Sequence, residues 1–371
     1  MGKDKKIIQS LLDTAGISIN GNQEYDIQVH DEAVYGRVIR HGALGIGESY
    51  MDGWWDCPRL DQFFHKIFEA DLEQQVRGDW NSLVRVVASY VLNPGRKSTA
   101  FRVGEKHYDL GNDLFTAMLD KRMTYTCGYW ATATDLDAAQ EAKLDLVCRK
   151  IGLKPGQTVL DIGSGWGSFL GFAAQRYGAN TVGMTVSAEQ KKLSDELYSQ
   201  LAATTQLQDY RDIRQTFDHV VSLGMFEHVG RKNYRTFMEV VHGALSDDGL
   251  FLLHTIGGNH STSDVDPWMG KYIFPGGMVP SIKQIGQSIE GLFVMEDWHN
   301  LSTDYDTTLM AWHDNFETNW DQIKSNYDER FRRMWNYYLL LSAASFRTRQ
   351  NQLWQIVLSK HGVPGGYRSV R

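Results

Sequence analysis

Cysteine is scarce in this chain, and its pattern excludes two kinds of site. The 371 residues contain three cysteines, Cys57, Cys127 and Cys148, and no two of them form a C-x-x-C pair. An odd and widely spaced set argues against a disulfide framework and against a zinc site. We therefore expect three free thiols and no bound metal.

Long apolar runs and an excess of positive charge are also missing. No stretch approaches the roughly 18 apolar residues that span a bilayer, and the opening residues MGKDKKIIQSLLDTAG lack the features of a signal peptide. We therefore expect a protein of the cytoplasm. The formal net charge of −7 gives no reason to expect nucleic acid as a partner and weakens simple adsorption to an anionic membrane.

The second part of the chain shows a regular alternation of two patterns. Short apolar runs alternate with helical periodicity, which predicts repeated βα units and hence a mainly parallel sheet in an α/β fold. The expected strands are 158–162, 181–185, 218–223 and 249–255, and the expected helices are 167–177, 187–203 and 231–245. Two later runs, 292–298 and 353–358, are expected to close the sheet.

The first part of the chain carries no catalytic motif. Residues 1–92 mix helical and strand patterns, with helices expected around 5–14 and 60–75, and they predict a smaller α+β N-terminal accessory domain. The stretch NPGRKST that begins at Asn93 combines proline, glycine and cations without apolar periodicity. It indicates a linker, which we place at 93–105.

The catalytic domain is then expected at 106–371. A Gly- and Pro-containing insert at 257–281 and a helix-rich region at 304–349 lie near the carboxyl ends of expected strands. Such an insert is a natural lid over a pocket.

The clearest chemical signal is the segment TVLDIGSGWGS at 158–168. It ends a strand in Asp161 and follows it with Gly163, Gly165 and Gly167. Glycines at this point let the backbone turn tightly and approach a ligand where an α/β sheet opens. The spacing G-x-G-x-G differs from the G-x-G-x-x-G of dinucleotide folds and is typical of S-adenosylmethionine (SAM) methyltransferases. A simple turn at a strand end is the alternative.

Other polar residues follow expected strands, and each has a structural alternative. Thr185, Ser187 and Gln190 offer hydroxyl and amide groups, although Ser187 equally suits the N-cap of the next helix. Glu227 suits a ligand or the start of a helix. His254 suits a buried core position or a group that titrates near neutrality. Cys127, in MTYTCGYW, suits a small buried apolar position, since no neighbouring cation indicates a reactive thiolate.

Several motifs in order carry a resemblance to a known family. HYDLGNDLF, MTYTCGYW, VLDIGSGWG, SLGMFEHVG, LHTIG, DPWMGKYIFPGG, VMEDWHN and DYDTTLMAW together resemble the cyclopropane-fatty-acyl-phospholipid synthases, which belong with the mycolic acid cyclopropane synthases. The similarity includes DGWWDCPRLDQFF in the N-terminal domain, which the shorter mycolic acid relatives lack. It implies a class I SAM-methyltransferase-like, Rossmann-like fold with a seven-stranded sheet. It also implies transfer of a methylene unit from SAM to the cis double bond of an unsaturated phospholipid acyl chain.

The resemblance also assigns residues to two sites. It implies a bicarbonate pocket formed by Cys127, Glu227, His254, Tyr305 and the backbone of Ile256. It implies a SAM site formed by Tyr125, Thr126, the loop 160–168 with Asp161 and its three glycines, the segment 185–190, and Tyr210 with Arg211 near the adenine. Ser164 stands where these enzymes frequently carry Cys, and we expect little consequence because it lies between two glycines.

The chemistry of an isolated alkene fits such a site. Attack of the alkene on the sulfonium methyl creates a carbocation, and a base must then remove a proton from the new methyl group. Aromatic faces stabilise a cation without trapping it, and Tyr129, Trp130, Tyr305 and Trp312 are candidates. Bound bicarbonate within reach of the proton would serve as the base. Glu227 beside this anion is reasonable if the ion is protonated and donates to the carboxylate, or if Glu227 orients the site.

Two other kinds of function remain open. One is a SAM methyltransferase that acts on a soluble small molecule, or on an unsaturated lipid without ring closure. The other is a lipid-binding or scaffold protein that keeps the fold without catalysis, against which the set of Cys127, Glu227, His254 and Tyr305 speaks. We also expect a homodimer, and a peripheral contact with the inner face of the membrane through the N-terminal domain and the linker cations Arg96 and Lys97.

Overall fold

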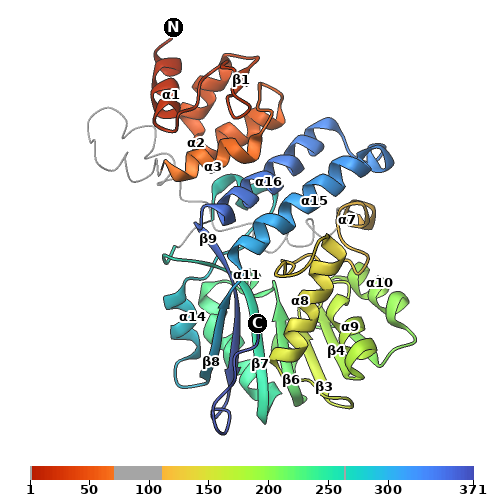
Figure 1. Cartoon of the computed structure of the whole chain (residues 1–371). Coiled ribbons are helices and arrows are strands. Elements are labelled where there is room, and N and C mark those ends of the chain that lie inside the picture. Colours follow the sequence, from red (N-terminus) through yellow and green to blue (C-terminus); the bar gives the residue numbers. More distant parts are fainter. Residues whose placement is uncertain (1, 71–110, 263–264) are drawn as a thin grey trace.

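The computed structural model describes residues 2–70, 111–262 and 265–371. The expected linker at 93–105, with Arg96 and Lys97, lies outside the described residues. Figure 1 shows the N-terminal helices at one end of the molecule, the sheet at the other, and a pair of long helices between them.

A seven-stranded sheet lies within the described chain after residue 110. Its strands in chain order are β3 (Thr158–Ile162), β4 (Asn180–Thr185), β5 (Ala203–Leu207), β6 (Phe217–Leu223), β7 (Leu245–Gly258), β8 (Val294–Asn300) and β9 (Asn351–Ser359). Their spatial order is β5-β4-β3-β6-β7-β9-β8. The strands from β5 to β7 are parallel, and β9 runs antiparallel to both β7 and β8. The expected mainly parallel sheet, closed by the two late strands, is therefore confirmed.

Helices cover both faces of this sheet, and the alternation along each strand explains why. Val159 of β3 packs in a buried cluster with Phe169 of α9 (Ser168–Tyr177), and α8 (Leu136–Lys150) contributes to the same cluster. The next residue, Leu160, packs in a second cluster with Phe237 of α12 (Tyr234–Ala244), together with α14 (Ile282–Ile289). Successive side chains of a strand point to opposite faces, so both faces are apolar and both are covered.

One predicted helix extends too far toward its C-terminus. The helix expected over 187–203 is α10 (Ala188–Tyr198), and β5 begins at Ala203 as an edge strand that the sequence prediction missed. The sequence of β5, ATTQL, has few apolar residues because an edge strand is half exposed, and Leu207 is 53% exposed. The other expected strands and the helices at 167–177 and 231–245 are confirmed within a few residues.

The N-terminal part is mainly helical. It contains α1 (Lys3–Thr14), α2 (Ala33–Met51) and α3 (Leu60–Glu69), and its strands are the two-residue β1 (Gln28–Val29) and β2 (Trp55–Asp56). The expected helix at 5–14 is confirmed, and the helix at 60–75 is confirmed as far as it is described. Sequence analysis missed α2, whose several glycines include a kink at Gly42 with φ +54°.

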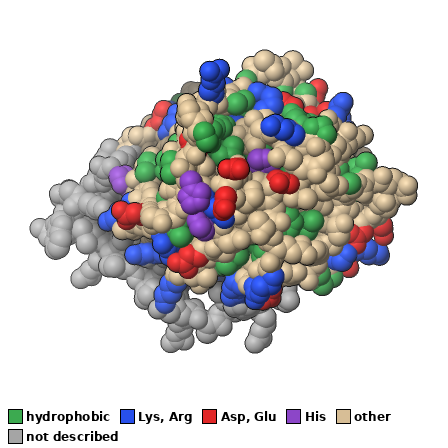
Figure 2. Space-filling view, turned by 90° about the horizontal axis from the view of Figure 1, so that it is seen from below, with side chains coloured by type: hydrophobic (Ala, Val, Ile, Leu, Met, Phe, Trp, Pro, Cys, Tyr) green, Lys and Arg blue, Asp and Glu red, His purple; other side chains and the backbone are tan. Residues whose placement is uncertain are grey.

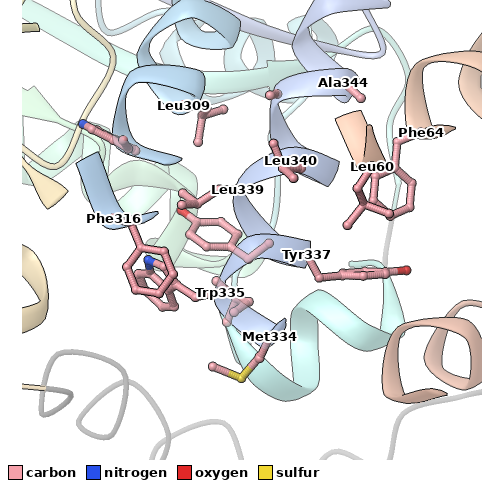
Figure 3. Packing of buried hydrophobic residues seen from close by; sticks show 14 of the residues in the cluster. Leu60, Phe64, Leu309, Phe316, Met334, Trp335, Tyr337, Leu339, Leu340 and Ala344 are labelled. Atoms are coloured by element: carbon pink, nitrogen blue, oxygen red, sulfur yellow. The ribbon is translucent and has the colours of Figure 1, made fainter. Parts of the chain in front are cut away.

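A shared apolar core joins the N-terminal helices to the long helix pair. The pair consists of α15 (Ser302–Ile323) and α16 (Glu329–Arg347), which fill the expected helix-rich region. Figure 3 shows Leu60 and Phe64 of α3 beside Tyr337 and Leu340 of α16, and the rings of Phe64 and Tyr337 lie 5.0 Å apart edge to face. The N-terminal part therefore buries its apolar surface against the last third of the chain.

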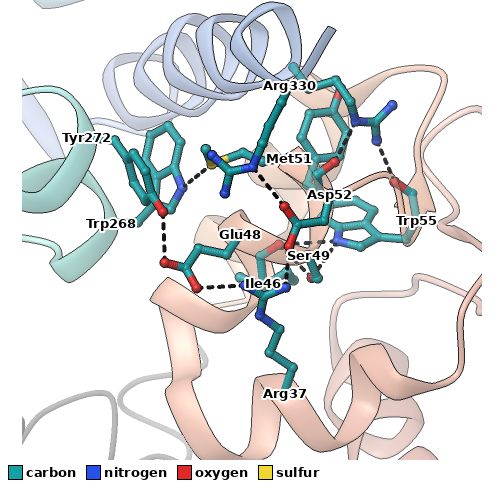
Figure 4. Close-up of polar contacts among 12 residues, drawn as sticks. Arg37, Ile46, Glu48, Ser49, Met51, Asp52, Trp55, Trp268, Tyr272 and Arg330 are labelled. Carbon is teal, nitrogen blue, oxygen red and sulfur yellow. Dashed lines mark hydrogen bonds and ion pairs between the residues drawn. The ribbon is translucent and has the colours of Figure 1, made fainter. Parts of the chain in front are cut away.

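Polar contacts tie the expected insert to the same N-terminal helices. Glu48 of α2 accepts hydrogen bonds from Arg37 and from Tyr272 (2.8 Å), as Figure 4 shows. It also accepts one from Lys271 (2.5 Å), which like Tyr272 belongs to α13 (Pro267–Tyr272). Trp268 of the same helix is fully buried, and a Cβ atom at Gly47 would lie 2.3 Å from its ring. The insert at 257–281 thus contacts α2 closely.

The surface at the far end of the sheet carries charges of both signs. Figure 2 shows Lys and Arg interspersed with Asp, Glu and His over that face, with scattered apolar side chains between them. Of the helices described, none has the length and apolarity to cross a membrane.

Candidate active site

The expected site residues gather at the carboxyl ends of the parallel strands. Asp161 is the last but one residue of β3, and Thr185 ends β4. Glu227 follows β6 in the short helix α11 (Phe226–Val229), and His254 lies near the end of β7. The strand order reverses between β3 and β6, where α/β sheets open the crevice that binds a ligand.

The three glycines of the loop after β3 have different roles. All have positive φ, +85° at Gly163, +54° at Gly165 and +82° at Gly167, which favours glycine. A Cβ at Gly163 would lie 2.5 Å from Met225, and one at Gly167 would lie 2.2 Å from Ser194 of α10, whereas none of the described atoms lies within 4 Å of a Cβ at Gly165. Packing of the protein therefore requires the outer glycines, and Gly165 faces open space that a ligand can use.

Asp161 is a buried carboxylate whose Oδ1 has no hydrogen-bond partner among the described residues. It is 2% exposed, and burial raises its pKa to about 7, against the charge of Lys143. A buried acceptor of this kind needs a donor. SAM carries an ammonium group and ribose hydroxyls, so Asp161 and the space beside Gly165 fit this molecule.

The polar residues after β4 pair with one another. Thr185 Oγ1 donates to Gln190 Oε1 at 2.8 Å, and Ser187 accepts from the Gln190 backbone amide at 3.3 Å as the N-cap of α10. The N-cap alternative for Ser187 is thus confirmed. After β5, Tyr210 packs against Phe237, and Arg211 pairs with Asp209 at 2.6 Å.

Glu227 and Ile256 are in direct contact. The backbone amide of Ile256 donates to Glu227 Oε1 at 2.6 Å, while Oε2 is buried and has no partner among the described residues. Burial raises the pKa of Glu227 to about 7. One carboxylate oxygen is therefore fixed by the fold, and the other is available to a ligand.

His254 lies two residues before Ile256 on β7 and is 1% exposed. Its Nδ1 is 3.3 Å from the amide Nε2 of Gln355 on β9, and its Nε2 has no partner among the described residues. Burial and the charges of Lys143 and Lys150 lower the pKa of His254 well below its usual value. The alternative that His254 titrates near neutrality is therefore wrong, because a buried imidazole beside two cations stays neutral.

Cys127 is held against α15. Its Sγ lies 3.1 Å from the Gly128 carbonyl and 3.9 Å from Thr308 Oγ1, one turn along the helix from Tyr305. Burial raises the pKa of the Cys127 thiol well above its usual value. Cys127 is therefore a protonated thiol, as the sequence indicated.

Aromatic rings line the same region. Tyr305 packs on Phe346 with centroids 4.5 Å apart and lies edge-on to Trp312 at 5.9 Å. Trp312 also lies 5.1 Å from the ring of Tyr125, whose hydroxyl is 2.9 Å from that of Tyr338. These rings connect the expected SAM residue Tyr125 with the expected bicarbonate residue Tyr305.

Sequence reasoning missed the polar residues of α8 and β9 that support the site. Gln140 and Lys143 lie on the buried face of α8. Gln355 lies beside His254 on the neighbouring strand, β9. The signal for the first two was present, since positions 136, 139, 140, 143, 144 and 147 form one helical stripe that is otherwise apolar. Within the described ranges, no three His, Cys, Asp or Glu side chains converge as metal ligands.

Comparison with known proteins places these observations in a family. The model of the mycolic acid cyclopropane synthetase family matches residues 95–356. The chain is 51% identical to a cyclopropane-fatty-acyl-phospholipid synthase of Escherichia coli (strain K12), over 99% of this chain and 96% of the relative.

Two solved structures share the fold at lower identity. The cyclopropane synthase MmaA2 of Mycobacterium tuberculosis has a TM-score of 0.67 at 29% identity and covers 72% of this chain and 100% of its own. The mycolic acid cyclopropane synthase CmaA1, complexed with SAH and CTAB, has a TM-score of 0.65 at 32% identity over 69% of this chain and 96% of its own. With the family model matching most of its length, the chain belongs to the mycolic acid cyclopropane synthetase family.

Proposed function

We propose that the chain transfers a methylene unit from SAM to the cis double bond of unsaturated phospholipid acyl chains and forms a cyclopropane ring. The observation that carries this proposal is the 51% identity to the E. coli synthase, which extends over 99% of the chain. The match therefore includes the N-terminal helices, beyond the residues 95–356 that the family model covers. The polar and aromatic groups at the strand ends support the same reaction.

The residues at the end of β3 suit the methyl donor. SAM supplies an electrophilic methyl group when it is bound. Asp161 offers an unpaired buried acceptor, and Gly165 in the loop after β3 faces open space. Tyr125 and Thr126 directly precede Cys127 in the sequence. The site of the methyl donor and the site of ring closure therefore share one short segment of the chain.

Glu227 and His254 suit a small oxyanion, and we propose bicarbonate. Because Gln355 Nε2–H donates to Nδ1 of the neutral imidazole, the proton of His254 is on Nε2 and can be donated to the ion. Glu227 Oε2 can accept the O–H of bicarbonate. The ion would supply the base for the new methyl group without a flexible side chain.

The aromatic groups suit the positive charge that develops on the acyl chain. Tyr305, Trp312 and Tyr125 present ring faces or edges in one cluster, and ring faces attract cations. The thiol of Cys127 stays protonated because it is buried, so it does not capture a carbocation as a thiolate would.

The decisive experiment is incubation with SAM and vesicles of a cis-unsaturated phospholipid, followed by mass and NMR analysis of the acyl chains. A gain of one CH2 with loss of the olefin signal is expected. A gain of CH2 with the olefin retained would indicate methylation without ring closure. Turnover only with a soluble acceptor would indicate a methyltransferase of small molecules. SAM binding without any turnover would indicate a lipid-binding or scaffold protein. Removal of bicarbonate from the buffer should lower the rate, and an unchanged rate would exclude the ion.

We further propose that residues 1–92 form an accessory domain and that the protein works as a homodimer in peripheral contact with the inner face of the membrane. The close packing of α2 and α3 on α13 and α16 supports a role beside the site. Removing this part would expose Tyr337 and Leu340, so the intact chain is the better test. Light scattering should give twice the chain mass, and the protein should sediment with unsaturated vesicles. A monomer that stays in the supernatant would contradict both proposals.

A further inference from the structure

Lys143 is a buried cation that the proposed mechanism does not use. It lies on α8, and its side chain is 0% exposed, among the largest fully buried side chains described. Removing an ammonium group from water is costly unless hydrogen bonds and opposite charges compensate. A lysine in such a position therefore needs an explanation beyond packing.

The hydrogen bond of Lys143 fixes a residue of the expected SAM site. Its Nζ donates to Thr126 Oγ1 at 2.7 Å. An ammonium group can only donate, so the hydroxyl of Thr126 is the acceptor here and keeps its own hydrogen for another acceptor. Thr126 is partly exposed although Lys143 is not. The buried Lys143 therefore orients the Thr126 hydroxyl, whose own hydrogen can be donated to another group.

The same helix also fixes the backbone of Thr126. Gln140, three residues before Lys143, donates from Nε2 to the Thr126 carbonyl at 2.7 Å. The methyl group of Thr126 packs against the turn after β6, where a Cβ at Gly224 would lie 2.7 Å from it. Side chain, carbonyl and methyl group are each held, so this threonine has little freedom.

Charged and titratable groups face Lys143 from several elements. Asp161 at the end of β3 and Asp120 after α7 (Asn112–Met118) both interact with its charge, and so do Cys127 and His254. Burial would favour the neutral form of Asp161, and Lys143 opposes this. The charge of Lys143 therefore favours the ionised form of Asp161, although burial has the larger effect on its pKa.

We propose that Lys143 is a positioning residue for SAM, which holds the Thr126 hydroxyl as a donor for the cofactor. The inference rests on the proposed function for the identity of the cofactor. Lys143 acts through its hydrogen bond to Thr126.

Binding of SAM and of S-adenosylhomocysteine, measured by calorimetry without lipid, tests the proposal. Lys143→Met keeps the length of the side chain and removes the charge, and we expect affinity to fall tenfold or more. Thr126→Val, which keeps the shape of the side chain, should weaken binding several-fold, and Thr126→Ser should lose less than Thr126→Val. The double variant Lys143→Met with Thr126→Val should bind SAM no more weakly than Lys143→Met alone, because both substitutions break the same hydrogen bond.

Lys150→Met is a matched control. Lys150 is the other fully buried lysine of α8, but its Nζ contacts His299 Nδ1 at 3.0 Å. We expect this variant to bind SAM as the parent does. Affinity of Lys143→Met within twofold of the parent would overturn the proposal. If Lys143→Met does not fold, unchanged affinity of Thr126→Val would overturn it equally.

The pH dependence of SAM affinity separates a charge effect from a structural one. Burial lowers the pKa of Lys143 to about 8, so affinity of the parent should fall as the pH rises above 8. This alkaline fall should be absent in Lys143→Met, and its persistence would count against the proposal. The two proposals can fail separately, because SAM binding is measured without lipid. If Lys143→Met loses SAM affinity but the parent forms no cyclopropane on vesicles, only the proposed function is refuted. Cyclopropane formation with an unaffected Lys143→Met would refute only this inference.

Discussion

The backbone amide of Ile256 donates a 2.6 Å hydrogen bond to Oε1 of Glu227, and this contact joins the short helix after β6 to the end of β7. The helix is only four residues long, so it has little stability of its own. The bond to β7 therefore fixes the direction of the carboxylate and leaves Oε2 for a ligand.

Glu227→Gln should keep this bond and remove the charge. We expect turnover to fall by about 10²–10⁴-fold, the usual effect of losing a group that positions a base, while SAM affinity stays within twofold of the parent. Product formation on vesicles and calorimetry with SAM measure the two effects separately. A variant that retains turnover within a few-fold would show that the charge of Glu227 is not needed.

Asp161→Asn should stabilise the protein without ligand at high pH and weaken SAM binding. Burial raises the pKa of Asp161 from 3.8 to about 7, so the folded protein holds this proton more tightly than the unfolded chain does. The contribution of this group to stability is therefore largest below about pH 4 and is lost as the pH rises to about 7. Urea unfolding should show a gain of about 1–3 kcal/mol for the variant at pH 8.

At pH 4.5 the free energy of unfolding of Asp161→Asn should differ less from that of the parent, because most of the Asp161 carboxyl is then protonated in the folded parent. An equal difference at the two pH values would contradict the role of ionisation. Glu227 has a raised pKa as well, so only the comparison of variant with parent isolates Asp161.

Gly165→Ala and Gly163→Ala should separate cofactor contact from internal packing. Both place alanine at positive φ, which costs about 1–2 kcal/mol, but only the Cβ at Gly163 would also meet Met225 at 2.5 Å. Thermal melts should show the larger loss of stability for Gly163→Ala. SAM affinity should fall for Gly165→Ala in a folded protein, and full affinity would remove Gly165 from the site.

The three cysteines should resist alkylation in the native protein. Cys57, Cys127 and Cys148 are buried, and burial raises the pKa of each thiol, that of Cys57 to about 12. Iodoacetamide at pH 8 should add no label within the time in which a small thiol reacts completely, because the thiolate is the nucleophile. Mass spectrometry after unfolding in urea should then show three labels. Rapid native labelling of Cys127 would contradict its buried, protonated state.

The sequence predicted the parallel core well because β3, β4, β6 and the buried part of β7 are apolar runs followed by glycines or a helix cap. The edge strand β5 was missed because its sequence, ATTQL, has few apolar residues, as a half-exposed edge strand allows. The helix α2 was missed because its glycines lower helix propensity, and tertiary contacts such as Trp268 on Gly47 stabilise it.

The site residues were predicted individually, but their pairings were not. That Ser187 caps α10 follows from local spacing, so it was open to sequence reasoning. That Gln355 faces His254 depends on the antiparallel register of β7 and β9, which no local pattern specifies. The lowered pKa of His254 depends first on burial and then on the charges of Lys143 and Lys150, all of which come from residues distant in sequence.

The packing of α3 on α16 has a consequence for how the chain acquires its structure during synthesis. Leu60 and Phe64 of α3 are made before the sheet, whereas Tyr337 and Leu340 beside them are made after α15. Contacts between such distant segments slow folding and leave apolar surface exposed in the meantime. The N-terminal helices therefore remain without these apolar partners on the nascent chain until strands β3 to β8 and α15 have been made.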